Sequence, residues 1–123
     1  MKLELSQRFF FDAAHTLERQ YETASSRRIH GHSYQAELTV CGEPDAVHGM
    51  VVDLAVLRGV IRELHEQLDH HFLDEVPGLA PATLENLCRW IAREAQQRLE
   101  GQARVIAVEV ARPSSGDRCV LRA

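Results

Sequence analysis

The sequence predicts an α+β domain in which four strands form a sheet and two helices cover one face of it. Two observations lead to this fold class. Apolar residues alternate with polar ones in segments near both ends of the chain, and they recur at helical spacing in two longer segments between them. The predicted order is therefore ββααββ. With 123 residues, the chain has the length of one domain, which we expect to span residues 1–123.

Two strands are predicted before the helices. Residues 2–15 alternate apolar and charged side chains before a β-prone run of three phenylalanines, and residues 33–40 alternate again. The polar stretch 16–31 between them has no period and predicts a loop, and a loop of that length is usually functional or disordered. Residues 42–45 turn the chain after the second strand, so the two strands are expected to pair as a hairpin.

Two capped helices and a second hairpin complete the predicted order. Asp53 and Thr83 each stand before a segment with apolar residues at helical spacing, where their side chains can accept hydrogen bonds from free N–H groups of the first turn. Gly101 predicts the end of the second helix. Segments 104–111 and 119–121 flank a Pro-Ser-Ser-Gly-Asp turn and predict the last two strands. A four-stranded sheet has two open edges, so we expect subunits to associate through them.

Composition excludes several classes of protein. The net charge is -4 and the isoelectric point is about 5.9, which is not the electrostatic footprint of a general nucleic-acid binder. No apolar run approaches the roughly 20 residues of a membrane span, and the N-terminal segment does not have the pattern of a signal peptide. The expectation is a soluble cytoplasmic protein. Cys41, Cys88 and Cys119 form no Cys-x-x-Cys pair and are interpreted as small buried hydrophobes.

The histidines carry the main chemical signal. His30 and His32 are two residues apart, so in a strand both side chains project from the same face, and Gly31 lets the backbone come close to a ligand. His15 ends the preceding strand and can reach the same place across the hairpin. Three neutral imidazoles without a fourth protein ligand are typical of an open zinc site, which can polarise a substrate oxygen. The alternative is that they are ordinary sheet histidines.

A second group, Asp69-His70-His71, follows the first helix. A carboxylate beside an imidazole fixes its tautomer and raises its basicity, which suits acid/base catalysis. The alternative is a solvated helix C-terminus, where the helix dipole favours histidine. His48 and His65 are interpreted as surface residues.

Taken in order, these motifs resemble the family of 6-pyruvoyl-tetrahydropterin synthase and 6-carboxy-tetrahydropterin synthase. The matching segments span nearly the whole chain, and together they are highly specific: Phe11-Asp12-Ala13-Ala14-His15, Ile29-His30-Gly31-His32-Ser33, Gly49-Met50-Val51-Val52-Asp53-Leu54, Leu68-Asp69-His70-His71-Phe72-Leu73 and Thr83-Leu84-Glu85-Asn86-Leu87.

The resemblance implies a fold, a cofactor and an activity. The fold is the tunnelling fold, in which the sheets of ββααββ subunits join into a trimeric β-barrel and two barrels usually stack into a hexamer. Active sites lie at subunit interfaces. Zinc is implied on His15, His30 and His32. The implied substrate is 7,8-dihydroneopterin triphosphate, which loses triphosphate to give the pyruvoyl product or yields 6-carboxy-tetrahydropterin and acetaldehyde on the way to queuosine.

Other site residues follow from the same resemblance. Asp69 and His70 stand where the family has its Asp-His proton relay, and Thr83 and Glu85 stand in the segment that lines the pterin pocket. The family's catalytic cysteine, four residues before the His-Gly-His motif, is replaced by Ser26. A thiol with a pKa of about 8.5 can be tuned to a thiolate, whereas a serine hydroxyl is far less acidic.

The second departure concerns the glutamate that grips the pterin in this family. Its place at the end of the third strand is taken by Arg112. A carboxylate accepts from the N–H donors of a pterin, but a guanidinium offers donors only.

The resemblance as a whole predicts a zinc-dependent pterin lyase of this family. Two alternatives stay open: a paralogue whose non-pterin, anionic substrate is held by Arg112, and an inactive zinc-containing binding protein.

Overall fold

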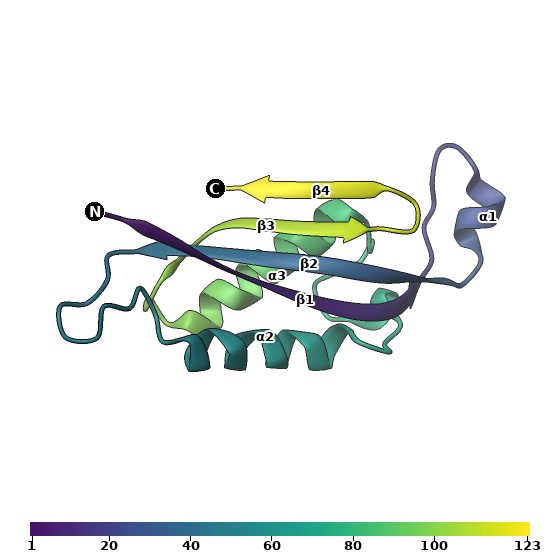
Figure 1. Cartoon of the computed structure of the whole chain (residues 1–123). Coiled ribbons are helices and arrows are strands. Elements are labelled where there is room, and N and C mark those ends of the chain that lie inside the picture. Colours follow the sequence, from purple (N-terminus) through teal and green to yellow (C-terminus); the bar gives the residue numbers. More distant parts are fainter.

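The predicted strands form one antiparallel sheet in the computed structural model, which describes residues 1–123 (Figure 1). Their order across the sheet follows their order in the chain: β1 (Leu3–His15), β2 (His30–Gly42), β3 (Arg104–Arg112) and β4 (Asp117–Arg122). The prediction of an α+β fold with two hairpins is confirmed. The second strand is longer than predicted and begins at His30, so the His-Gly-His motif belongs to the strand itself.

Two long helices cover one face of the sheet. They are α2 (Leu54–Leu68) and α3 (Leu84–Leu99), and both begin at the predicted caps. The Asp53 carboxylate accepts a hydrogen bond from the Ala55 N–H at 2.8 Å, and the Thr83 hydroxyl accepts one from the Asn86 N–H at 3.1 Å. No helix is both long and apolar enough to span a bilayer.

The prediction of an unstructured loop over residues 16–31 is wrong for its second half. The helix α1 (Thr23–Arg27) forms there, with Ser26 as its buried residue. A short 3-10 helix, η1 (Leu73–Glu75), follows α2 and was also not predicted. Helices of one or two turns have too few residues to show a helical period in the sequence. Their stability comes from tertiary contacts rather than from local pattern. Figure 1 shows α1 projecting beyond the end of the sheet where β1 ends and β2 begins.

The core lies between the sheet and the two long helices. Alternate residues of each strand face the helices, so Phe9 and Phe11 are buried while Phe10 is 62% exposed on the other face. Tyr34, Ala36, Leu38 and Val40 are all buried, as their alternation predicts. Cys88 is buried as predicted, and Cys41 and Cys119 are half-buried.

The segment after α2 lies against the outer edge of β1. The His70 N–H donates to the Asp12 carbonyl at 2.7 Å, and the Ala14 N–H donates to the His71 carbonyl at 3.1 Å. The Asp69 carboxylate accepts from the Asp12 N–H at 2.9 Å. These bonds fix Asp69 and His70 beside the end of the strand that carries His15.

Candidate functional site

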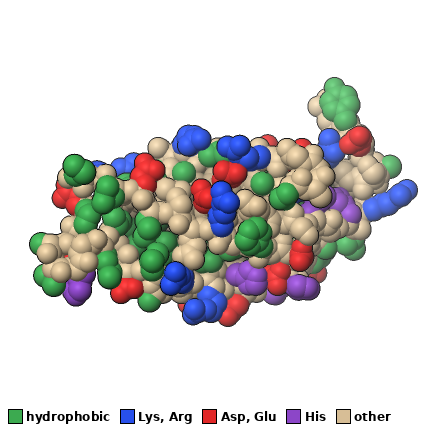
Figure 2. Space-filling view, in the orientation of Figure 1, with side chains coloured by type: hydrophobic (Ala, Val, Ile, Leu, Met, Phe, Trp, Pro, Cys, Tyr) green, Lys and Arg blue, Asp and Glu red, His purple; other side chains and the backbone are tan.

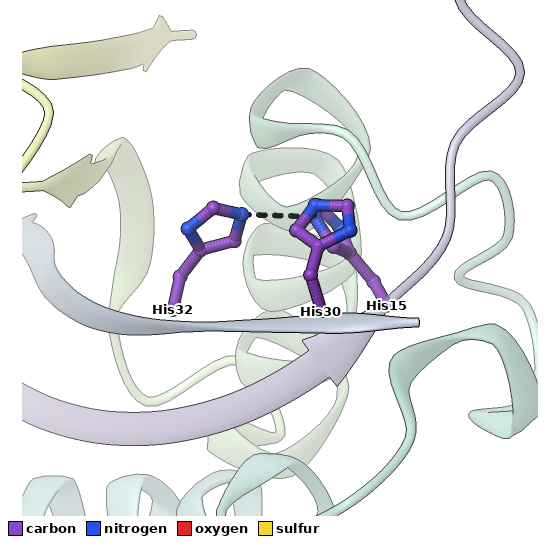
Figure 3. A group of neighbouring side chains, drawn as sticks. All are labelled: His15, His30 and His32. Atoms are coloured by element: carbon purple, nitrogen blue, oxygen red, sulfur yellow. Dashed lines mark hydrogen bonds between the residues drawn. The ribbon is translucent and has the colours of Figure 1, made fainter. Parts of the chain in front are cut away.

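Three histidine side chains meet where the first hairpin opens. His15 lies directly opposite His30 in the β1–β2 register, and His32 is two residues further along β2. The side chains point toward one another (Figure 3), with their Nε2 atoms 2.8 Å apart for His15 and His30 and 3.1 Å apart for His15 and His32. The predicted convergence of these residues is therefore present.

The hydrogen bonds of the imidazole rings show which of their nitrogens have a lone pair free to bind a metal. His15 Nδ1 lies 2.9 Å from the Ala82 carbonyl and His30 Nδ1 lies 2.7 Å from the Arg28 carbonyl. A carbonyl only accepts, so both rings carry their proton on Nδ1 and turn an Nε2 lone pair toward the other. Two facing lone pairs repel unless a cation lies between them. Nitrogens on one tetrahedral zinc are about 3.3 Å apart, close to the observed spacing, so the donor set fits zinc.

The environment of His15 and His32 favours the neutral form of both rings, which is the form that binds metal. Burial lowers the pKa of His15 below its usual value, against the opposing effect of the bond to Ala82. Burial and the nearby Arg112 guanidinium lower the pKa of His32 to about 4. At neutral pH His15 and His32 therefore present lone pairs rather than protons.

A cavity of about 680 Å³ opens beside His30 and His32. It brings together four residues that the sequence predicted to be in the site, since its lining includes Ser26, Thr83, Glu85 and Arg112. They come from α1, the start of α3 and the end of β3, so segments far apart in the chain meet in its wall. Figure 2 shows histidine side chains at the surface near the base of α1, with others along the lower edge of the molecule and at its opposite end.

The Ser26 hydroxyl is engaged within its own loop. It donates to the Thr23 carbonyl at 3.0 Å and lies 3.5 Å from the Arg19 N–H. The side chain is 5% exposed. Ser26 thus closes the loop around α1, with its proton directed at a backbone carbonyl.

Arg112 reaches from the end of β3 to the histidines. Its Nη1 lies 3.4 Å from His32 Nε2, and its Nη2 donates to the Asp117 carboxylate at 3.0 Å. Ser115 donates to the same carboxylate oxygen at 3.0 Å. Asp117 was not predicted to belong to the site, although counting back across the hairpin would have placed it opposite Arg112. Ala82, whose carbonyl orients His15, carried no signal because its side chain takes no part.

Asp69 and His70 form a close pair outside this cavity. His70 Nδ1 lies 2.7 Å from the Asp69 carboxylate, and this hydrogen bond raises the pKa of His70. The bond from the Asp12 N–H and the contact with His70 lower the pKa of Asp69. His70 lines a second hollow, together with Asp12, Ser33 and Ser114. Asp69 and His70 therefore form the hydrogen-bonded pair that their adjacency predicts. Within one chain, neither residue lines the cavity that contains Ser26.

Comparisons with known proteins agree with this geometry. The family model of 6-pyruvoyl tetrahydropterin synthase matches residues 4–123. The chain is 32% identical over 94 residues to a 6-carboxy-5,6,7,8-tetrahydropterin synthase of Synechocystis, covering 72% of this chain and 71% of the relative. It is 30% identical over 106 residues to a dihydroneopterin monophosphate aldolase of Pyrococcus furiosus, covering 85% of each.

A solved structure gives the same fold. The 6-pyruvoyl tetrahydropterin synthase of Caenorhabditis elegans superposes with a TM-score of 0.86 at 20% identity, covering 100% of this chain and 96% of the other. The sheet, the order of its strands and the two covering helices are thus those of the tunnelling fold. Since the family model spans almost every residue, the chain belongs to the 6-pyruvoyl tetrahydropterin synthase family.

Proposed function

We propose that this protein is a zinc-dependent lyase of the 6-carboxytetrahydropterin or 6-pyruvoyltetrahydropterin synthase type, acting on a pterin substrate such as 7,8-dihydroneopterin triphosphate. The observation that carries the proposal is the convergence of three Nε2 atoms, two of which are left with a free lone pair by bonds from Nδ1–H to backbone carbonyls. The relatives named above are a pterin synthase and a dihydroneopterin aldolase, which supports the choice of substrate class.

His15, His30 and His32 would hold the zinc. When bound there, zinc supplies a positive charge that polarises substrate oxygens and acidifies neighbouring C–H and O–H bonds. The cavity beside the histidines supplies the room for a substrate. In its wall, Thr83 and Glu85 at the first turn of α3 offer a hydroxyl and a carboxylate to the N–H donors of a pterin ring.

The proton-transfer pair is proposed to come from a neighbouring subunit. Asp69 and His70 lie at the outer edge of β1, and the turn after Arg112 lies beside β4, the opposite edge of the sheet. If β1 of one subunit pairs with β4 of the next, the pair comes next to that subunit's hairpin and its cavity. Antiparallel order makes this possible, because β1 ends and β4 begins at the same end of the sheet. A trimer closed in this way has one complete site at each interface.

One observation favours a second candidate function. Arg112 presents N–H donors where the resemblance implies a carboxylate, and a carboxylate is what would accept from a pterin. A diverged enzyme that holds an anionic, non-pterin substrate on Arg112 is consistent with that exchange.

Metal analysis and product analysis test the proposal. We expect the purified protein to contain about one zinc per chain by elemental mass spectrometry, and His15→Ala to lose it. His48→Ala is the matched control, because His48 is exposed and paired with Asp45. Incubation with 7,8-dihydroneopterin triphosphate should yield a pyruvoyl or a 6-carboxy product by mass spectrometry. Metal-free wild-type protein that is folded would overturn the zinc assignment, and zinc-loaded protein without turnover would favour the second candidate.

A further inference from the structure

The guanidinium of Arg112 and the metal would compete for the same atom. Arg112 Nη1 lies 3.4 Å from His32 Nε2, and His15 Nε2 lies 3.1 Å from that same atom. A neutral imidazole has one lone pair, which can either accept a hydrogen bond or bind a metal. When His32 binds metal, Arg112 Nη1 therefore loses its acceptor.

Arg112 then has two donor atoms without partners. Its Nε is buried and has no hydrogen-bond partner in the structure, and Nη2 is already held by Asp117. The side chain is 19% exposed, so water reaches it poorly. Buried guanidinium donors without acceptors are costly, and Asp117 holds the side chain in place so that it cannot simply turn away to solvent.

Electrostatic repulsion gives a second reason for an acceptor beside Arg112. A guanidinium beside a divalent cation is repulsive, and the carboxylate of Asp117 is on the far side of the guanidinium from His32, at Nη2. The other charged residues of the cavity are Arg19 and Glu85, one of each sign. An anionic ligand oxygen between Arg112 and the metal meets both needs, since it accepts from Nη1 in place of His32 and offsets the repulsion between the two cations.

We propose that Arg112 makes this metal centre an oxyanion site: the ligand that occupies it carries a carboxylate or phosphate group placed between Arg112 and the metal held by His15, His30 and His32. The inference rests on the proposed function only in taking those histidines as a metal site. Its consequence is reciprocal coupling, in which metal tightens the binding of an oxyanion and the oxyanion tightens the binding of metal by the same factor.

Cobalt(II) in place of zinc gives a readout that does not depend on catalysis. The affinity of the protein for Co²⁺ is measured by competition with a chelator, and the visible absorption of the Co²⁺ protein is then followed during titration with acetate in one arm and inorganic phosphate in the other. The variants are Arg112→Gln, Arg112→Lys and, as the matched control, Arg118→Gln. Arg118 lies on the same hairpin but pairs with Glu109 and is 60% exposed. Circular dichroism confirms that each variant is folded.

We expect acetate or phosphate to change the spectrum of wild type and Arg118→Gln. In Arg112→Gln the affinity for that anion should fall at least about tenfold, while Co²⁺ alone should bind more tightly because competition and repulsion are gone. Arg112→Lys should retain part of the anion affinity. The stronger of the two probes identifies the anionic group. Unchanged anion affinity in Arg112→Gln overturns the inference and leaves the metal site standing, whereas wild-type protein that does not bind Co²⁺ overturns the proposed function as well.

Discussion

The Asp69–His70 pair is the clearest case in which one side chain sets the chemistry of another. The Asp69 carboxylate lies 2.7 Å from His70 Nδ1 and stabilises the imidazolium, so the pKa of His70 is raised above its usual 6.5. The stabilising effect is complete below that usual value and is lost as the pH rises through the raised pKa. Asp69→Asn should therefore lower the pKa of His70, as measured by an NMR titration of the imidazole C–H signals.

The Asp45–His48 pair provides the control for that titration. His48 Nδ1 lies 3.3 Å from the Asp45 carboxylate, in the loop at the other end of the sheet. Asp45→Asn should leave the pKa of His70 unchanged. If the His70 titration is the same in wild type and Asp69→Asn, the pair does not tune proton transfer.

Ser26 gives a second prediction at the residue scale. Its hydroxyl donates to the Thr23 carbonyl, and its place in the cavity wall is where the resemblance implies a catalytic thiol. Ser26→Cys should raise turnover of 7,8-dihydroneopterin triphosphate by at least about tenfold, because a thiolate removes a proton far more readily than a hydroxyl. Ser6→Cys puts a thiol outside the cavity, where Ser6 is hydrogen-bonded to Thr39, and should give no gain. An equal rate in all three proteins would mean that Ser26 does not limit the reaction.

These residues also mark what could be predicted from the sequence. The shared face of His30 and His32 follows from strand periodicity, and His15 follows from the hairpin. The contact between Arg112 and His32 joins residues 80 positions apart and depends on the order of the strands in the sheet. The positions of Asp69 and His70 depend on hydrogen bonds between their segment and the backbone of Asp12 and Ala14. The pattern of side chains in the sequence does not reveal such bonds.

At the scale of elements, the three histidines gather at the open end of the first hairpin, where β1 ends and β2 begins. His15 ends β1, His30 begins β2, and the Ala82 carbonyl that orients His15 belongs to the segment before α3. A metal bound there would hold the three side chains together, and His15 links this end of the hairpin to the segment before α3 through the Ala82 carbonyl. The caps Asp53 and Thr83 made both long helices predictable, whereas α1 and η1 are too short for any periodicity to reveal them.

Metal removal should therefore destabilise this end of the fold. At a free zinc concentration 1,000 times its Kd, binding adds about 4 kcal/mol to the free energy of unfolding. We expect a chelator to lower the melting temperature of wild-type protein measured by circular dichroism, and zinc to restore it. His15→Ala should melt at the lower temperature with or without the chelator. A melting temperature that the chelator does not change would contradict a metal that ties these elements together.

At the scale of the whole molecule, the positions of the two edges of the sheet, β1 and β4, are consistent with a site divided between subunits. The segment 69–72 lies along the end of β1, at one edge, and the hairpin that carries Arg112 forms the other edge. Within one chain His70 shares a hollow with His32 and Ser114, but neither Asp69 nor His70 lines the cavity that contains Ser26 and Arg112. Neighbouring chains can bring the pair to that cavity by pairing β1 with β4.

Subunit mixing tests this arrangement directly. His70→Ala and His30→Ala should each be inactive on 7,8-dihydroneopterin triphosphate, yet coexpression of the two should restore about a quarter of the wild-type activity, because random mixing leaves one interface in four with both residues intact. Mixing His30→Ala with His32→Ala is the matched control and should restore nothing, since every cavity then lacks a ligand. Light scattering should give a mass of three or six times 13.9 kDa for each mixture. Assembled mixtures of His70→Ala and His30→Ala that stay inactive would place the proton-transfer pair in the cavity of its own chain.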